Sequence, residues 1–294
     1  MKNSKAKNPD FPSFSVAMCV YQKDRPDWFE KAIYSVTNQT VRPKELVLVI
    51  DGPIPQGLEN VIRKYKGNCR DIIFKVIRFK KNQGHGIARR RSVKECTTNI
   101  VALMDADDIS YGDRFEQQLS KMLSIKADVV GGNISEFVSE ESNIVAYRDV
   151  PVHDDEIKKY MKKRCPMNQM TVMFKKNAYD MAGGYRDWYQ DEDYYLWIRM
   201  AEKGAKFSNT GTVLVNVRVG EDMYRRRGGI KYFKSEAKLQ IYMLRKGMIG
   251  IGRCSLNLLL RLTVQVVLPN GLRGWLFCNL ARRKEKISYG KYKI

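Results

Sequence analysis

The stretch IVALMDADD, residues 100–108, decides the fold. Five apolar residues run directly into Asp105, Asp107 and Asp108, which predicts a buried strand that ends in a cluster of carboxylates. Such a cluster repels itself unless a cation neutralises it, and Mg²⁺ and Mn²⁺ prefer oxygen ligands. The alternative is a solvated acidic turn that caps a helix near Asp113. The preceding buried strand favours the metal site.

Apolar runs alternate with helical patterns on the N-terminal side of this stretch. We predict strands over 14–21, 45–50, 72–79 and 100–104, with helices over 26–39, 57–65 and 86–96 between them. This alternation predicts an α/β fold with a doubly wound, mostly parallel sheet. Ligands of such sheets bind beyond the carboxyl ends of the strands. Ile50 runs into Asp51 and Met104 into Asp105, so both carboxylates are expected to face one crevice.

The composition fits a globular protein of 294 residues with a net charge of +21. The basic, polar start carries no apolar run and so predicts no export signal, and no stretch reaches the ~18 apolar residues of a membrane span. The cysteines are scattered without a CxxC pair, which argues against zinc and disulfides and fits a reducing cytoplasm. The charge calls for an anionic partner: nucleic acid, membrane or phosphorylated substrate.

Two further segments carry polar groups suited to a nucleotide. Asp51 precedes Gly52 and can accept a hydrogen bond from a nucleobase, although Asp-Gly-Pro is also a good turn by itself. The segment NQGHGIAR, residues 82–89, resembles a dinucleotide fingerprint, but Arg89 replaces its third glycine. We interpret it as a loop that leads into a helix N-terminus, with Arg89 available for phosphate or acidic neighbours; the alternative is a structural loop with a solvated basic turn.

A third acidic cluster follows Gly183-Gly184-Tyr185, at residues 191–193. Group transfer to a hydroxyl needs a base, and a carboxylate beside other carboxylates has its proton affinity raised toward that task. The alternative is an ordinary acidic helix N-terminus. His85 and His153 are the only histidines, and neither is assigned a catalytic role.

These segments, in their order along the chain, resemble family 2 glycosyltransferases of the bacterial capsule, exopolysaccharide and lipopolysaccharide type. The segments are SVAMCVYQ, SVTNQT, ELVLVIDG, NQGHGIARR, ALMDADD and GGYRDWYQDEDYYLW, within residues 13–235. The resemblance implies a GT-A fold, a nucleotide-diphosphate sugar donor, Mn²⁺ or Mg²⁺, and inversion at the anomeric carbon. It also implies a UDP-sugar (Gal, GalNAc, Glc or GlcNAc) as donor and a glycan or polyprenyl-diphosphate-linked molecule as acceptor.

The resemblance also implies site residues. Cys19 and Tyr21 match positions that line the nucleoside pocket, Asp51 matches a uracil contact, and Asn82, Gly84 and Arg89 match the loop beside the nucleotide. Asp105 and Asp107 match the metal and ribose-diphosphate motif, with Asp107 favoured for the metal and Asp108 as a structural residue. Asp193 matches the catalytic base. Arg226 lies in a basic loop that resembles one closing over the diphosphate.

The chain departs from the family pattern at two positions. Ile50 stands where many members have an aspartate, and Arg90 where an asparagine is common. The chain also lacks the Gln-x-x-Arg-Trp motif and the spanning helices of processive synthases, which predicts transfer of a single sugar.

The C-terminal part differs in composition. Residues 229–249 are predicted to be helical, and Arg253, Asn257, Arg261 and Gln265 then form a narrow polar stripe on an apolar helix ended by Pro269. With the basic residues 282–286, this pattern predicts a helix lying on the anionic inner face of the cell membrane. The alternative is a helix packed on the catalytic domain or across a homodimer.

The predicted organisation is a flexible N-terminus at 1–12, a catalytic domain at 13–235 and a helical, basic, membrane-associating region at 236–294. The rival functions are a nucleotidyltransferase on a similar sheet and a basic nucleic-acid-binding protein. The second is disfavoured because no aromatic-basic recognition motif appears and the acidic crevice would repel phosphates without a cation.

Overall fold

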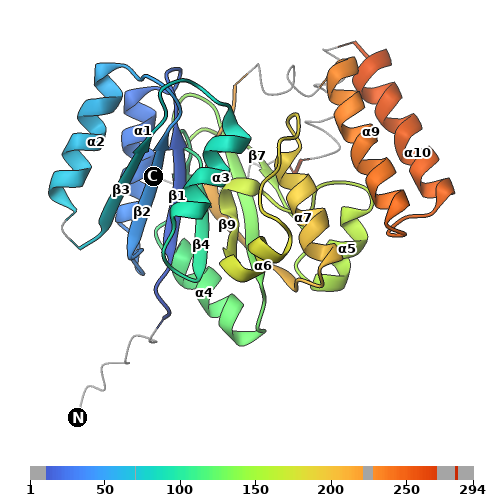
Figure 1. Ribbon diagram of the computed structural model, residues 1–294, viewed down its shortest axis with the longest axis horizontal. Coiled ribbons are helices and arrows are strands. Elements are labelled where there is room, and N and C mark those ends of the chain that lie inside the picture. Colours follow the sequence, from blue (N-terminus) through green and yellow to red (C-terminus); the bar gives the residue numbers. More distant parts are fainter. Residues whose placement is uncertain (1–10, 70, 221–227, 270–281, 284–294) are drawn as a thin grey trace, which may run out of the picture.

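The computed structural model describes residues 11–69, 71–220, 228–269 and 282–283. The strands of these residues form one nine-stranded sheet in the order β3-β2-β1-β4-β8-β6-β9-β5, with β7 paired to β6. Its first half consists of β1 (Ser15–Val20), β2 (Glu45–Ile50), β3 (Ile73–Arg78) and β4 (Ile100–Met104). All neighbouring pairs among these four strands are parallel. Figure 1 shows them at one end of the molecule with their helices around them.

Helices cover both faces of this half because successive strand residues point to opposite sides. Val16 and Met18 of β1 belong to the core beneath α1 (Pro26–Thr37), α2 (Gln56–Asn68) and α4 (Arg114–Ser124). Ala17, between them, belongs to the core on the other face, which includes Val93 of α3 (His85–Glu95). Strands β1, β2 and β4 are buried on both faces, which explains their nearly continuous apolar sequences, whereas β3 at the edge is only partly buried. The predicted α/β, doubly wound, mostly parallel fold is therefore confirmed.

Antiparallel strands enter the sheet in its second half. Its strands are β5 (Ile109–Ser110), β6 (Val129–Phe137), β7 (Ile144–Arg148), β8 (Met173–Lys175) and β9 (Phe207–Arg218). The short β8 lies antiparallel between β4 and β6, and β9 runs parallel to β6. The helical segments here are α5 (Asp154–Met161), the 3₁₀ turn Gln169–Thr171, α6 (Lys176–Met181) and α7 (Glu192–Glu202). The N-terminus of α7 thereby comes to face the ends of the parallel strands.

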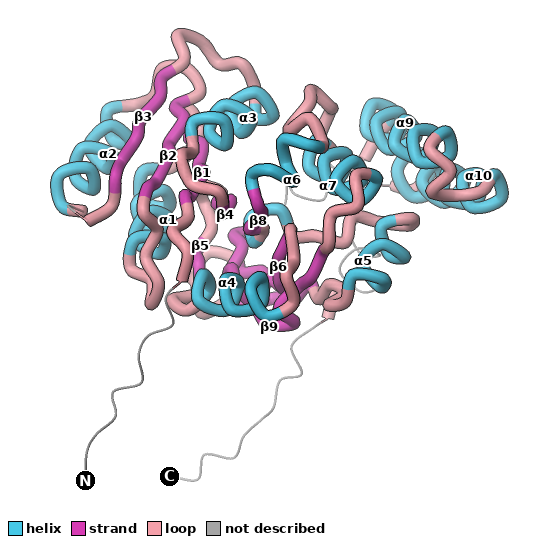
Figure 2. Tube along the Cα trace, turned by 60° about the horizontal axis from the view of Figure 1, so that its bottom comes forward, coloured by secondary structure: helices cyan, strands magenta, loops and turns pink. Residues whose placement is uncertain are grey.

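Two helices complete the described chain: α9 (Ile230–Arg245) and α10 (Ile251–Leu262), which continues as a π-helical turn, Thr263–Val267. They lie side by side at the end of the molecule opposite α2 (Figures 1 and 2). Helix α9 crosses the predicted domain boundary between 235 and 236, and its Leu239 and Met243 belong to the same core as α7. A separate membrane-associating region after residue 235 stays a prediction.

Near its C-terminal end the chain returns to the sheet. Arg283 pairs with Tyr147 of β7 through backbone hydrogen bonds in both directions. The neighbouring Arg282 forms a buried ion pair with Glu136 of β6, with 2.7 Å between Nε and Oε1. A buried carboxylate is costly without such a partner, so this return secures the β6–β7 edge.

Candidate active site

A cavity of about 460 Å³ opens at the carboxyl ends of β1, β2 and β4. Seven of the predicted site residues line it: Cys19, Tyr21, Asp51, Asn82, Gly84, Asp105 and Asp107. Residues from four separate segments meet here because parallel strands present their carboxyl ends at one edge of the sheet. We call this space the donor-side cavity.

Asp51 joins the end of β2 to the loop before α3. Its carboxylate accepts the backbone N–H of Gln83 at 2.7 Å and that of Gly84 at 3.0 Å, and the Asn82 amide donates to its carbonyl at 3.3 Å. Gly52 is required beside it, because its φ is +91° and a Cβ there would lie 2.7 Å from the Asn82 nitrogen. The bound carboxylate keeps lone pairs that can accept a further donor from a ligand.

Two carboxylates that follow β4 differ in their surroundings. Burial alone would raise the pKa of Asp105, but the charges of Arg89 and His85 outweigh it and the pKa is lowered. The pKa of Asp107 is raised, first by burial and then by the charge of Asp105. Asp108 is buried and accepts the backbone N–H of Arg218 at 3.0 Å, which ties the turn to β9 and fits a structural role.

The described residues hold no group of three or more His, Cys, Asp or Glu side chains that could complete a metal site. Mg²⁺ and Mn²⁺ are commonly held by one or two carboxylates together with water and substrate phosphates. Asp105 is already paired with Arg89, whereas Asp107 forms no ion pair with a lysine or arginine of the described chain. These residues fit an ion that Asp107 shares with a diphosphate.

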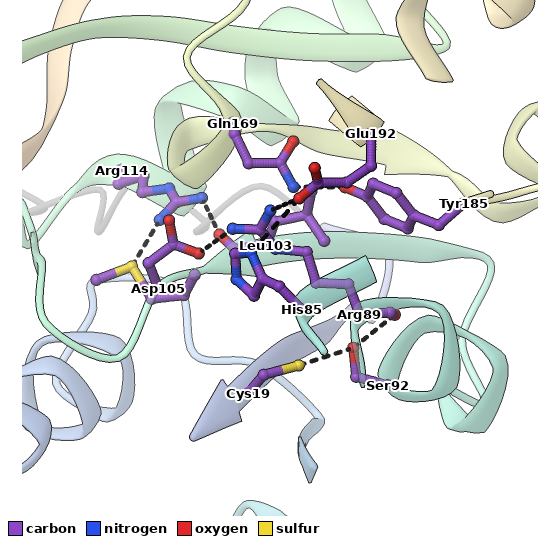
Figure 3. Close-up of polar contacts among 11 residues, drawn as sticks. Cys19, His85, Arg89, Ser92, Leu103, Asp105, Arg114, Gln169, Tyr185 and Glu192 are labelled. Carbon is purple, nitrogen blue, oxygen red and sulfur yellow. Dashed lines mark hydrogen bonds and ion pairs between the residues drawn. The ribbon is translucent and has the colours of Figure 1, made fainter. Parts of the chain in front are cut away.

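Arg89 lies between two acidic residues, Asp105 and Glu192 (Figure 3). Its guanidinium donates to Oδ1 of Asp105 at 2.7 Å and to Oε1 of Glu192 at 3.1 Å. The side chain is buried, and both of its charged partners come from other segments. Arg89 therefore orients the aspartate turn against the N-terminus of α7.

The two acidic residues at the start of α7 face different spaces. Glu192 lies beside the donor-side cavity, with Oε1 3.4 Å from Nδ1 of His85. Asp193 lines a second cavity of about 370 Å³, which we call the acceptor-side cavity. Burial, and then the charge of Glu192, raises the pKa of Asp193 to about 6. Such a carboxyl is ionised at neutral pH and accepts a proton more readily than an ordinary aspartate.

The acceptor-side cavity is bounded by basic, acidic and apolar groups. Its lining includes the basic Arg148, Lys163 and Arg164, the acidic Asp191 and Glu236, and the apolar Leu260 and Val264 of the C-terminal helical segment. Burial and the neighbouring Glu236 raise the pKa of Asp191 to about 8. The basic groups make this cavity suitable for an anionic ligand.

Two residues at the site were missed by the sequence analysis. Asp24 lines the donor-side cavity, and burial raises its pKa to about 7. His85 lines the same cavity and contacts Glu192, although no role was predicted for it. Asp24 follows β1 closely, so the rule that predicted Asp51 and Asp105 could have found it; the contact of His85 with Glu192 had no local signal. The predicted Arg226 lies outside the described residues.

Comparison with known proteins identifies the family. A model described as "Glycosyl transferase family 2" matches residues 15–179, which contain β1 to β8 and the whole donor-side cavity. The chain belongs to this glycosyltransferase family.

Two curated relatives of this family 2 glycosyltransferase match over most of their length. A UDP-Gal:alpha-D-GlcNAc-diphosphoundecaprenol beta-1,3-galactosyltransferase from Escherichia coli is 33% identical over 93% of this chain and 98% of its own. The amylovoran biosynthesis glycosyltransferase AmsE from Erwinia amylovora is 34% identical over 90% of this chain and 97% of its own.

One solved structure has a fold similar to that of this chain. The mannosyltransferase PcManGT from Pyrobaculum calidifontis, in complex with GDP-Man and Mn²⁺, superposes with a TM-score of 0.61 at 14% identity. The superposition covers 90% of this chain and 72% of that one. No helix in the described part of this chain combines the length and apolar character needed to cross a bilayer.

Proposed function

We propose that this family 2 enzyme transfers one hexose, with inversion, from a UDP-sugar to a glycan or polyprenyl-diphosphate-linked acceptor in surface polysaccharide biosynthesis. The observation that carries the proposal is the placement of Glu192 and Asp193. Asp193 lines the acceptor-side cavity, and the preceding Glu192 contacts His85, which lines the donor-side cavity. A carboxylate of raised pKa therefore lies in one cavity, one residue away from a contact to the other, which supports transfer between two substrates.

In this proposal the nucleotide occupies the donor-side cavity. Cys19 and Tyr21 line the nucleoside end, Asp51 accepts an N–H of the base, and Asn82 and Gly84 form the neighbouring wall. Arg89 holds Asp105 toward the ribose and diphosphate. The donor is UDP-Gal, UDP-GalNAc, UDP-Glc or UDP-GlcNAc, in keeping with the UDP-Gal donor named for the E. coli relative.

The chemistry is a displacement at the anomeric carbon. Asp193 takes the proton of the acceptor hydroxyl, the hydroxyl oxygen forms the new glycosidic bond, and the bond from the sugar to the diphosphate breaks with its electrons leaving on UDP. Attack from the face opposite the leaving group inverts the anomeric carbon. Mn²⁺ or Mg²⁺, held by Asp107 with Asp105, would offset the charge that builds on the departing diphosphate.

Incubation with each UDP-hexose and a GlcNAc-diphospho-lipid acceptor tests the proposal, with UDP and pyrophosphate measured separately. We expect UDP release that depends on the acceptor, and a product whose new linkage has the inverted configuration by NMR. Release of pyrophosphate, as in a nucleotidyltransferase, or a retained configuration would contradict the proposal.

Asp193→Asn keeps the shape of the side chain and removes the base. We expect kcat to fall by about 10²- to 10⁴-fold. The matched control is Asp187→Asn, because this exposed aspartate precedes the same helix but lies outside both cavities. A folded Asp193→Asn enzyme with a normal rate would assign the base elsewhere.

A further inference from the structure

Helix α10 and its π-helical extension face the protein with their polar side. Asn257 is buried and donates to the carbonyl of Lys162 at 2.8 Å and to Gln240 at 2.7 Å. Arg261 pairs with Glu236 at 2.9 Å, and Gln265 also contacts Glu236. The polar stripe that the sequence predicts is thus used to dock this helix onto α9 and the segment after α5.

The apolar side of the same helix faces outward. Its exposed apolar residues are Ile251, Leu256, Leu259, Leu260, Leu262, Val266 and Val267, and we call them the leucine face. Leu259 is 62% exposed and Val267 is 68% exposed. The usual amphipathic helix of a globular protein has the opposite arrangement, with its apolar stripe toward the core. Seven apolar side chains on one continuous helical segment indicate a surface that meets an apolar environment.

The charges around the leucine face identify that environment. Arg253 of α10, Lys162 and Lys163 after α5, and Arg245 at the end of α9 are all exposed. An apolar helix face with a basic border fits an anionic lipid surface, where the apolar side chains enter the acyl boundary and the cations meet the headgroups. A second copy would bring another chain of net charge +21 against the same basic border.

The acceptor-side cavity lies at the edge of this surface. Leu260 belongs to the leucine face and also lines the cavity that contains Asp193. Lys163 likewise belongs both to the basic border and to the cavity lining. If the enzyme docks on a membrane through the leucine face, the acceptor-side cavity therefore lies next to the headgroup region, where a lipid-linked diphosphate lies.

We propose that the leucine face and its basic border dock this enzyme on an anionic lipid bilayer, with α10 lying in the plane of the interface and the acceptor-side cavity beside the headgroups. The docking does not require the proposed sugar transfer. Only one part of the proposal rests on the proposed function: that docking brings the acceptor-side cavity close to a lipid-linked acceptor.

Sedimentation of the full chain with vesicles tests the docking. One set of vesicles contains phosphatidylcholine alone, and the other contains phosphatidylcholine with about 30% phosphatidylglycerol. We expect binding to the anionic vesicles that weakens with salt. Leu259→Ser/Val267→Ser should lower the partition coefficient at least about tenfold, because two apolar side chains no longer enter the bilayer. Neither residue lines a cavity.

The matched control is Ile73→Ser/Leu123→Ser, which removes side chains that are 57% and 50% exposed on β3 and α4. This control should bind vesicles as the wild type does. Failure of the wild type to bind anionic vesicles, or undiminished binding by the α10 variant, would overturn the proposal. A wild-type dimer that the α10 substitutions dissociate, without vesicle binding, would assign the face to a second copy and overturn it as well. UDP-hexose hydrolysis without acceptor should be unchanged in the α10 variant, which separates this test from that of the proposed function.

Discussion

Asp193, the proposed base, has a proton affinity suited to that role. Burial and Glu192 raise its pKa to about 6, and the proposed reaction requires its ionised form. We therefore expect kcat to fall as the pH drops through about 6 and to level off above pH 7. A pH–rate profile under saturating donor and acceptor measures this limb. A profile that stays flat down to pH 5 would show that Asp193 does not titrate in the rate-limiting step.

The same raised pKa makes Asp193 a cost to stability at neutral pH. The folded state binds this proton more tightly than the unfolded chain, so the stability it contributes is present below pH 3.8 and lost as the pH rises through about 6. Asp24, with a pKa of about 7, behaves in the same way. Each of the two cavities therefore holds a carboxyl group whose ionised form the fold disfavours relative to the unfolded chain.

The positions of individual site residues could be predicted where these residues directly follow a strand. Asp51, Asp105 and Asp107 do so, and their meeting in one cavity agrees with the rule for parallel sheets. Their chemical roles stay predictions. The ion pair of Arg89 with Glu192 joins residues 103 positions apart, and no local pattern encodes such a contact.

At the scale of elements, the turn after β2 gives a stability prediction. Gly52→Ala would place a Cβ 2.7 Å from the Asn82 nitrogen, at a residue whose φ is +91°. The turn and the loop bound by Asp51 must therefore move apart. We expect the free energy of unfolding to fall by about 1–3 kcal/mol, together with weaker UDP binding. Denaturant unfolding and calorimetry measure the two effects.

Gly67→Ala is the control for this substitution. Gly67 lies within α2, and a Cβ there meets no atom within 4 Å. Replacing a helical glycine with alanine should stabilise the chain by about 0.5–1 kcal/mol. If both variants lose stability equally, close packing at Gly52 is not the cause.

The helices and strands of the first half were predicted to within a few residues, because each is a simple apolar run or an amphipathic pattern. The predicted strand 72–79, for example, is β3 at Ile73–Arg78, and the predicted helix 86–96 is α3 at His85–Glu95. The stripe on α10 was also predictable, but which side of the helix faces the protein was not. That depends on Glu236 and the carbonyl groups after α5, which accept the buried polar side chains.

At the scale of the whole molecule, ligand binding at the turn that contains Asp105 and Asp107 should stabilise the fold. We expect Mn²⁺ and UDP together to raise the melting temperature more than the sum of their separate effects, because the ion and the diphosphate share one site. Asp107→Asn should remove this joint effect while leaving the melting temperature without ligands close to that of the wild type. Thermal unfolding with and without each ligand measures it; an unchanged joint effect in the variant would place the ion elsewhere.

The order of the sheet beyond β4 could not be predicted from local patterns. β8 is three residues long, and it joins β4 to β6 through pairings that are remote in sequence. Contacts between distant segments decide this half of the molecule, which is also where the acceptor-side cavity forms.

The pairing of Arg282 with Glu136 has a consequence for the synthesis of the chain on the ribosome. Glu136 is made about halfway through translation, but its buried cation is added 146 residues later. During that interval the β6–β7 edge carries an uncompensated acid, and chains that terminate early keep it permanently. Chains truncated before Arg282 should therefore be more susceptible to proteolysis than the full chain, which limited proteolysis measures.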